Sequence, residues 1–380
     1  MDKKQKSFHS GRAIFSLLSL ICCFLIGAVL KIASSVILPF TIAVLLAFVM
    51  YPIVKWLDSR WVPRFFSILL IIIIIILGLS VFGMALFTSG RNILSNITIY
   101  EYRLREIYIV AAQLFDLPHN ETISVWENLW GQLGIRTWVG NFAVSFSNNL
   151  LNFTSTAVLV ILFIVFILLE ASYFREKILT AFEDRSNKIM KMGNDLMIQV
   201  TRYLTAKFFI SLVTGIAIFV GTWLIKLEFA LFWGILAFIL NFIPNLGSIA
   251  AGVATSLFAL VQFWPNPIPV ILVIVVILSV NMIIGNVIDP KVVGDHVGIS
   301  PLVVLVSLGF WGYLWGFAGM VLSVPMTVII KIICENIPIL EPISVFIGSR
   351  KAVEVKKEYS RYLQWLYGRK KNKDKEKDEV

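Results

Sequence analysis

The chain has 380 residues, of which 58% are hydrophobic and only 15% are charged. Soluble globular domains carry about a quarter charged residues, so this composition excludes an ordinary soluble fold. The formal net charge of +10 would fit a nucleic-acid-binding protein, but the basic residues gather at the chain ends and beside apolar segments. The positive-inside rule explains that placement, so we expect contact with a lipid bilayer and no nucleic-acid partner.

Long uninterrupted apolar runs determine the expected fold class. The run from Phe65 to Leu79 contains six consecutive isoleucines and has no polar face. Backbone groups in hydrocarbon must pair with one another, so such a run is expected to cross the bilayer as a helix. Transmembrane β-strands would alternate apolar and polar residues, and these runs do not. The sequence therefore predicts an all-α polytopic membrane protein.

Six apolar segments have about the length, ~20 residues, that a spanning helix needs. They are Ile14 to Leu30, Ile32 to Val54, Phe65 to Phe87, Leu150 to Leu169, Phe208 to Ile225 and Pro269 to Ile288. The first resembles a signal peptide, but Lys31 and Ile32 replace a small-residue cleavage site, so we interpret it as a span. Basic residues after the second and fourth spans predict that the N-terminal residues 1–12 and the charged tail 334–380 are cytoplasmic.

Two further apolar stretches are interrupted by residues that break helices. Residues 229–263 are broken at Pro244-Asn245-Leu246-Gly247, and residues 301–333 around Gly309, Gly312, Gly316 and Gly319. Each stretch follows a full span, and the two preceding spans run in opposite directions. We therefore expect two re-entrant hairpins in an inverted repeat, forming a transport unit over residues 208–333. Two kinked pairs of short helices, packed for structure alone, would give the same breaks.

Two linkers between the spans carry amphipathic helical patterns. Residues 89–149 are expected outside the cell, and their first part repeats apolar residues at heptad spacing. These residues are Ile93, Ile97, Tyr100, Leu104, Ile107, Ala111 and Leu114. Such a helix would either lie on its own membrane domain or join subunits into a homo-oligomer. Residues 171–207 have a similar apolar face and are expected to lie along the cytoplasmic surface.

Motifs for enzyme chemistry are absent from the sequence. There is no Gly-x-x-x-x-Gly-Lys-Ser/Thr loop for ATP and no His-Glu-x-x-His zinc motif. The histidines and cysteines have no metal-site spacing: they are His9, His119, His296, Cys22, Cys23 and Cys334. The sequence therefore predicts neither an enzyme nor a bound metal or cofactor.

Polar residues within or beside the apolar segments are candidates for a solute or ion pathway, because charges at mid-bilayer are costly and usually functional. Together with the proline and glycine residues beside them, the candidates are Asn241, Pro244, Asn245, Gly247, Asn281, Asn286, Asp289 and Pro290. We favour Asn241 and Asn286, since Asp289 and Lys291 flank Pro290 as they would in an ordinary loop. Lys207 lies at a helix end, where snorkelling to the surface is the default interpretation.

Glycines supply the candidates in the second interrupted stretch. Gly312, Gly316 and Gly319 permit tight turns or close helix approach. Purely structural use would give the same pattern. These residues therefore mark where a binding or moving part lies, and do not indicate what it binds.

Several motifs resemble the signature of the autoinducer-2 exporter family of permeases. They are Asn286-Val-Ile-Asp-Pro-Lys-Val-Val-Gly294, Ile299-Ser-Pro-Leu-Val-Val-Leu305, Gly316-Phe-Ala-Gly319, Ser323-Val-Pro325 and the earlier Asn241-Phe-Ile-Pro-Asn-Leu-Gly247. The resemblance extends from the first span to about Ile333. It implies a bacterial inner-membrane permease with two hairpins, often oligomeric, and adds Pro301 and Pro325 to the candidate residues. Ser300 stands where many relatives carry histidine, which leaves the substrate open.

We therefore expect a permease that moves a small polar organic solute by alternating access, with the furanosyl signal autoinducer-2 as one candidate. The asparagines, the aromatic Trp311 and Trp315, and the few buried charges favour a neutral hydroxylated solute. A sodium/proton antiporter is the main alternative and needs a titratable carboxylate at membrane depth, for which Asp289 is the candidate. A membrane scaffold that transports nothing is the second alternative.

Overall fold

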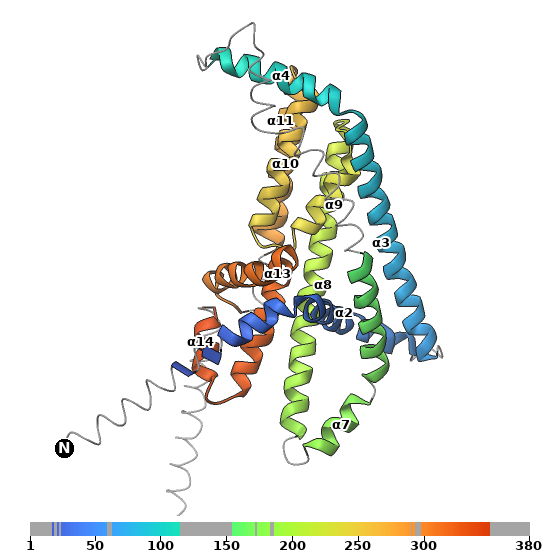
Figure 1. The fold of residues 1–380 in the computed structure, drawn as a ribbon, viewed down its shortest axis with the longest axis vertical. Coiled ribbons are helices and arrows are strands. Elements are labelled where there is room, and N and C mark those ends of the chain that lie inside the picture. Colours follow the sequence, from blue (N-terminus) through green and yellow to red (C-terminus); the bar gives the residue numbers. More distant parts are fainter. Residues whose placement is uncertain are drawn as a thin grey trace, which may run out of the picture. The chain divides into compact units, whose positions relative to one another are not determined.

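The computed structural model describes residues 17–18, 21–22, 24–58, 63–114, 154–171, 173–182, 186–289, 291–292 and 298–349. This described part is helical apart from turns and one isolated bridge between Ile299 and Gly348. Its labelled helices are α2 (Ser34–Asp58), α3 (Arg64–Ser95), α4 (Ile97–Leu114), α7 (Phe174–Ala181), α8 (Ser186–Leu224), α9 (Ala230–Leu240), α10 (Leu246–Phe263), α11 (Pro267–Val280), η1 (Asn281–Ile288), α13 (Pro301–Asn336) and α14 (Glu341–Ile347). Figure 1 shows their arrangement.

Six helices in the described part are long and apolar enough to cross a membrane. They are Ser34–Asp58, Arg64–Ser89, Ser186–Leu224, Leu246–Phe263, Pro267–Ile288 and Pro301–Asn336. The all-α class and the number of spans agree with the sequence-based prediction, but the set differs. The expected fourth span is the shorter helix Thr154–Glu170, and six of the seventeen residues of the expected first span lie outside the described residues. Their places in the count are taken by Leu246–Phe263, one arm of the first interrupted stretch, and by Pro301–Asn336, which contains both arms of the second.

Helix α8 differs from the expected linker followed by a span. Its 39 residues form one helix, about 58 Å long at 1.5 Å per residue. A hydrocarbon core of about 30 Å cannot contain that length, so one end of α8 extends beyond the apolar region. Nothing between residues 186 and 224 breaks a helix, since this segment contains no proline. The amphipathic pattern and the apolar run therefore share one element.

The chain divides into two compact units. One unit comprises Met1–Leu45, Ser172–Thr201 and Asp295–Val380, and the other comprises Leu46–Ala171 and Arg202–Gly294. The first interrupted stretch lies in the second unit and the second stretch lies in the first unit. Each unit therefore contains one of the two predicted helix breaks.

Hairpin 1 consists of α9, the turn at residues 241–245 and α10. A straight helix would separate Trp233 from Phe258 by about 38 Å, yet their ring centroids are 5.2 Å apart. The chain therefore reverses direction between them. Asn245 adopts a left-handed φ of 59° in this turn. A Cβ on Gly247 would collide with the Leu240 carbonyl, so only glycine permits the two arms to approach this closely.

Hairpin 2 consists of the two arms of α13, which run in different directions (Figure 1). The reversal occurs at Trp315 and Gly316, and Gly316 has a φ of 59°. Ser307 and Thr327 would be about 30 Å apart along a straight helix, but their hydroxyl oxygens are 2.6 Å apart. A Cβ on Gly319 would collide with the Trp311 carbonyl near the tip. The predicted break is thus present, and residues 315–316 form it.

The tip of hairpin 2 contacts the N-terminal helical residues of the same unit. Trp315 Nε1 donates to the Leu30 carbonyl oxygen at 3.0 Å. Lys31 Nζ lies 3.7 Å from the centroid of the Tyr313 ring, within cation–π range. The Trp311 and Trp315 rings pack together with centroids 4.9 Å apart. The tip is therefore attached to residues 30–31 by both polar and aromatic contacts.

Helix α4 contacts the base of hairpin 1, the end away from its turn (Figure 1). Tyr100 Oη donates to Glu228 in the loop before α9, and Arg103 donates to the carbonyl of Gln262 near the end of α10. Gln262 also accepts from the Glu228 backbone N–H at 2.7 Å and donates to the Lys226 carbonyl at 3.0 Å. We call these contacts the α4 clasp. It ties both ends of hairpin 1 to one helix.

Candidate functional site

A pocket lies among α8, α9, α10 and the junction of α11 with η1. The space between the side chains there is about 280 Å³, which includes open solvent. Half of its ten lining residues are polar and none is charged. The polar residues are Thr214, Asn241, Ser248, Thr255 and Asn281. Enclosed small-molecule sites have volumes from about 300 Å³, so this partly open pocket would have to widen to surround a solute.

Three pocket hydroxyls donate their hydrogens to carbonyl oxygens. Thr214 donates to Ile210 O at 2.8 Å and Thr255 to Ala251 O at 2.8 Å, each four residues earlier in its own helix. Ser248 donates to Asn245 O at 3.2 Å. A hydroxyl has one donor hydrogen and two acceptor lone pairs. These three side chains can therefore still accept hydrogen bonds but have no further hydrogen to donate.

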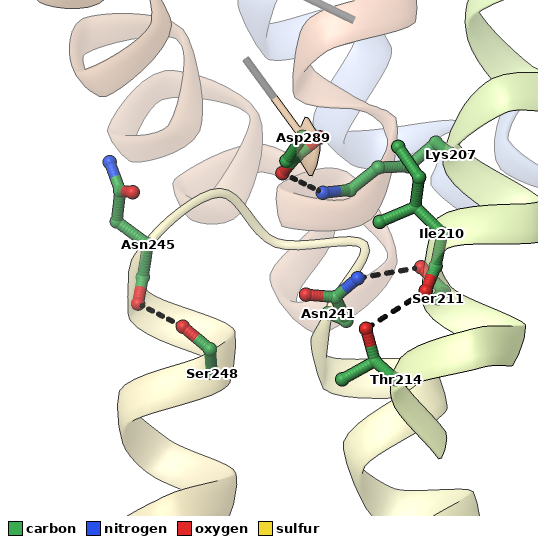
Figure 2. A network of polar contacts seen from close by, with 8 residues as sticks. All are labelled: Lys207, Ile210, Ser211, Thr214, Asn241, Asn245, Ser248 and Asp289. Atoms are coloured by element: carbon green, nitrogen blue, oxygen red, sulfur yellow. Dashed lines mark hydrogen bonds and ion pairs between the residues drawn. The ribbon is translucent and has the colours of Figure 1, made fainter. Parts of the chain in front are cut away.

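Two amides complete the polar lining. Asn241 Nδ2 donates to Ser211 Oγ at 3.0 Å, which joins the turn of hairpin 1 to α8 (Figure 2). The Asn241 carbonyl oxygen and the whole Asn281 amide have no hydrogen-bond partner among the described residues. An amide offers both donors and an acceptor. The pocket therefore has unused hydrogen-bonding capacity and no formal charge.

An ion pair lies one helical turn from the hydrogen bond between Asn241 and Ser211. Lys207 Nζ is 2.8 Å from Asp289 Oδ2, and the side chains are 4% and 26% exposed. Lys207 precedes Ser211 by four residues on α8, about 6 Å along the axis, and Figure 2 shows the pair beside Asn241 and Ser211. Snorkelling of Lys207 to the surface was the sequence-based interpretation and is wrong, since this side chain is buried. A buried ammonium requires such a partner because desolvation is costly.

The structure brings together only some of the residues predicted to line a pathway. Asn241 and Asn281 share the pocket. Asn286 is exposed on η1, away from the pocket lining, although it was one of the two favoured candidates. Asp289 pairs with Lys207, and Pro290 lies outside the described residues. All of these roles remain predictions.

The remaining candidates occupy the two hairpins. Pro244, Asn245 and Gly247 form or follow the turn of hairpin 1. In hairpin 2, the first residue of α13 is a proline, the tip contains three glycines and one arm contains a second proline: Pro301, Gly312, Gly316, Gly319 and Pro325. These residues shape the turns and close approaches. Any further role for them remains a prediction.

Sequence reasoning missed four polar residues of α8 and α10. Ser211 and Thr214 follow Lys207 at intervals of four and three residues, which places all three on one face of α8. That spacing was visible in the sequence. Ser248 and Thr255, also seven residues apart, follow the break on α10 in the same way. Serine and threonine are common in membrane helices because they bond to their own backbone, so this signal is weak by itself.

Comparison with known proteins identifies the family. The family model described as "AI-2E family transporter" matches residues 14–339 of the chain. This chain belongs to the AI-2E transporter family. The family prediction made from the sequence motifs is thereby confirmed.

Named relatives of this AI-2E family member cover most of its length. A "Putative transport protein" of Borreliella burgdorferi is 32% identical over 324 residues, which is 85% of this chain and 87% of the relative. The "AI-2 transport protein TqsA" of Escherichia coli K12 is 31% identical over 339 residues, with 86% and 93% covered. A "Putative transport protein" of Haemophilus influenzae is 29% identical over 330 residues, with 85% and 93% covered. The protein is therefore a membrane transporter of a family of transport proteins.

Proposed function

We propose that this AI-2E family member moves a small, uncharged, polar organic solute across the bacterial inner membrane, and that the pocket is its binding site. The single observation that carries the proposal is the polar but uncharged lining beside a helix break. Irregular backbone at membrane depth is tolerated where it lines a cavity or is buried in protein. Asn241, at the start of the break, supplies a pocket amide.

Autoinducer-2 is the first solute to test. A relative with 31% identity over 339 residues carries the name AI-2 transport protein. The furanosyl hydroxyls of this signal would donate to the oxygens of Thr214, Ser248 and Thr255, which have already used their own hydrogens. The chemistry of the pocket and the name of the relative thus point to the same class of solute.

Transport in this proposal proceeds by alternating access. The two repeats, α8 with hairpin 1 and α11–η1 with hairpin 2, would expose the pocket to one side of the membrane and then to the other. Re-entrant insertion of both hairpins and an inverted relation between the repeats belong to the same proposal. Fold-back contacts within each hairpin support it, because an arm pair that reverses inside the bilayer enters and leaves on one face.

The expected topology follows from the basic residues. Both termini would be cytoplasmic, and α4 would lie outside the cell on the linker of residues 89–149. The protein would act as a homo-oligomer, with the apolar positions of α4 as one contact between subunits. Tyr100 of that series is buried against hairpin 1 within a single chain, which favours packing on its own membrane domain for that residue.

A cation/proton antiporter is the second candidate, and the Lys207–Asp289 pair is the observation behind it. An antiporter needs a carboxylate that can exchange a proton for a cation. Lys207 already neutralises Asp289 at 2.8 Å, so a cation would have to displace the ammonium group. Because the pocket itself has no carboxylate, we favour the organic solute. A scaffold without transport fits the family least.

Flux measurements in proteoliposomes test the proposal. Thr214→Val, which removes a pocket oxygen, is expected to lower autoinducer-2 flux about 3- to 10-fold, the effect of one lost hydrogen bond. Thr222→Val is the matched control, because Thr222 is also buried on α8 and also donates to the carbonyl four residues earlier, but does not line the pocket. Its flux should stay at the wild-type level.

Sodium-driven proton movement is measured in the same vesicles. If the wild type exchanges protons but does not move the organic solute, and Asp289→Asn abolishes that exchange, the protein is an antiporter and the proposal is wrong. If neither assay detects transport, the membrane scaffold becomes the favoured function. Equal loss of flux in Thr214→Val and Thr222→Val would remove the pocket from the pathway.

A further inference from the structure

The polar groups of the pocket differ in what they can still offer a solute. Thr214, Ser248 and Thr255 can only accept, since their hydrogens are bound to carbonyls. Asn241 has one amide hydrogen bound to Ser211 and an unbound carbonyl oxygen. Asn281 is the one pocket side chain of the described residues whose donors and acceptor are all unbound. A solute that both donates and accepts therefore meets its main donor in Asn281.

The position of Asn281 supports a role in binding. Its backbone N–H bonds to Ile277 O and Leu278 O, so the main chain is satisfied without the side chain. A Cβ on Gly252 would lie 3.8 Å from Asn281 Nδ2, which places the amide against α10 across a glycine. The side chain is half-buried. A partly desolvated amide without a protein partner costs free energy unless water or a ligand binds it.

The backbone at Asn281 is also unusual. Asn281 is the first residue of η1, an eight-residue π-helix that continues α11. π-Helical turns are rare, less favourable than α-helical turns and frequent at functional sites. The adjacent Met282 is 69% exposed, whereas Asn281 is half-buried and lines the pocket, so Asn281 lies on the inward side of the helix. The π-helix therefore begins at the residue whose side-chain amide has no hydrogen-bond partner among the described residues.

We propose that Asn281 is the specificity-determining residue of the pocket, whose amide binds a hydroxyl or carbonyl oxygen of a neutral solute and discriminates against analogues that lack it. This inference rests on the proposed function and assigns the selectivity of the same site to one side chain. A site built to hydrogen-bond a substrate group rejects the analogue without that group more strongly than an apolar pocket does. The oxygens of Thr214, Ser248 and Thr255 would hold the solute's hydroxyls on the other side.

Charge selectivity follows from the same arrangement. No lining residue is charged, and the nearest described ion pair, Lys207 with Asp289, is internally neutralised. An ion in the pocket would therefore lack a counter-charge. Replacing the Asn281 amide by a carboxylate, in Asn281→Asp, supplies that charge with almost no change of shape. This variant is expected to bind autoinducer-2 at least about tenfold more weakly and to become sensitive to sodium ions.

The experiment measures equilibrium binding to the purified full-length protein in nanodiscs. The probes are labelled autoinducer-2, an analogue lacking one ring hydroxyl, and sodium chloride as competitor. Asn281→Leu is expected to reduce the ratio of the two affinities at least about tenfold, and Asn281→Gln, which keeps the amide, to restore part of it. Met282→Ala, the exposed neighbour on the same π-helix, should keep the wild-type ratio.

The outcomes separate this inference from the proposed function. A wild-type protein that neither binds nor transports the neutral solute contradicts both. Wild-type selectivity that persists in Asn281→Leu contradicts the role of Asn281 and leaves the pocket in place. If Asn281→Leu does not give a monodisperse protein, Asn281→Gln and Asn281→Asp decide. Equal affinity ratios in those two variants would likewise overturn the inference.

Discussion

The two helical hairpins reverse the chain in different ways and use their polar residues differently. Hairpin 1 turns over five residues, 241–245, and Asn241 in that turn faces the pocket. Hairpin 2 turns at Trp315 and Gly316, and its buried hydroxyls bond between its own arms: Ser307 donates to Ser323 O at 3.0 Å and contacts Thr327. Both stretches carry the same sequence signal, glycine and proline in an apolar run. Hairpin 1 nevertheless turns beside a polar pocket, whereas the buried hydroxyls of hairpin 2 are hydrogen-bonded within the hairpin.

The hairpins are also attached at opposite ends. The α4 clasp holds the base of hairpin 1 through Glu228 and Gln262. Hairpin 2 is held at its tip, where Trp315 donates to Leu30 O. Among the described residues, one side-chain hydrogen bond, from Asn241 to Ser211, joins the tip of hairpin 1 to another helix. The tip of hairpin 2 also has the cation–π contact between Lys31 and Tyr313, so fewer of these contacts need to break for the tip of hairpin 1 to move.

A glycine substitution in hairpin 2 should have the largest effect on stability, and it tests whether the two arms of this hairpin depend on close packing. Gly319→Ala places a methyl group against the Trp311 carbonyl, and we expect a loss of about 2–3 kcal/mol or failure to fold. Gly309→Ala is the control, because its Cβ would meet nothing within 4 Å. Thermal unfolding in detergent measures both. Equal transition temperatures would contradict the close approach of the two arms.

Ion pairs offer a second comparison between the two regions. Removing one partner of a buried pair leaves an uncompensated charge, so Lys207→Met should cost about 2–3 kcal/mol, reduced from the fully buried case because Asp289 is 26% exposed. The double change with Asp289→Asn should recover most of that loss. On hairpin 2, Lys331 and Glu335 are 3.7 Å apart and Glu335 is 42% exposed, so Glu335→Gln should cost about 0.5 kcal/mol or less. A double-mutant cycle on thermal unfolding gives these values, and a double variant no more stable than Lys207→Met would contradict the pairing.

Hydroxyl removal should separate the hairpins by function. Ser307→Ala removes bonds between the arms of hairpin 2 and is expected to cost about 1 kcal/mol of stability without changing solute affinity. Ser248→Ala on hairpin 1 removes a pocket oxygen and should weaken solute binding about threefold with little effect on stability. Thermal unfolding and binding are measured on both variants. If both variants change stability and solute affinity alike, the proposed difference in function between the hairpins is wrong.

The last comparison concerns the α4 clasp. Burial, together with the hydrogen bond to Glu228, raises the pKa of Tyr100 above its ordinary value of 10.0. The folded protein keeps this proton where the unfolded chain loses it, so the stabilisation is complete below pH 10 and is lost as the pH rises further. Tyr100→Phe keeps the packing on Phe258 and should cost about 1 kcal/mol at pH 7. Unfolding between pH 7 and 11 should show the two proteins converging above pH 10, and a constant difference would contradict the proton's role.

Apolar length and helix-breaking residues made much of the fold predictable. Four of the predicted spans, the break near Pro244 and the break near Gly316 follow from composition and from residues that disfavour a helix. The continuity of α8 was not predicted, because an amphipathic helix and an apolar helix share the 3.6-residue period and join without a signal. The π-helix η1 has no known sequence signature. Its residues 281–288 read as an ordinary apolar helix.

The candidate site was less predictable than the fold. Asn241 and Asn281 were recognisable as amides in apolar segments, but their meeting in one pocket depends on the fold-back of α10 against α11. Lys207 and Asp289 are 82 residues apart in the chain, and neither residue alone indicates the other. Asn286, an equally plausible amide, lies two residues after the buried Ile284, on the opposite side of the helix, and is exposed. Only the packing of this span in the fold determines which of its faces turns inward.

The aromatic tip of hairpin 2 gives the protein its own optical label. The Trp311 and Trp315 rings pack in a tilted arrangement with centroids 4.9 Å apart, and the indole N–H of Trp315 is bound to the Leu30 carbonyl. Indole fluorescence responds to the polarity and hydrogen bonding of its surroundings. A transport cycle that detaches this tip from Leu30 would shift the emission wavelength of Trp315, whereas a cycle confined to hairpin 1 would leave its spectrum unchanged.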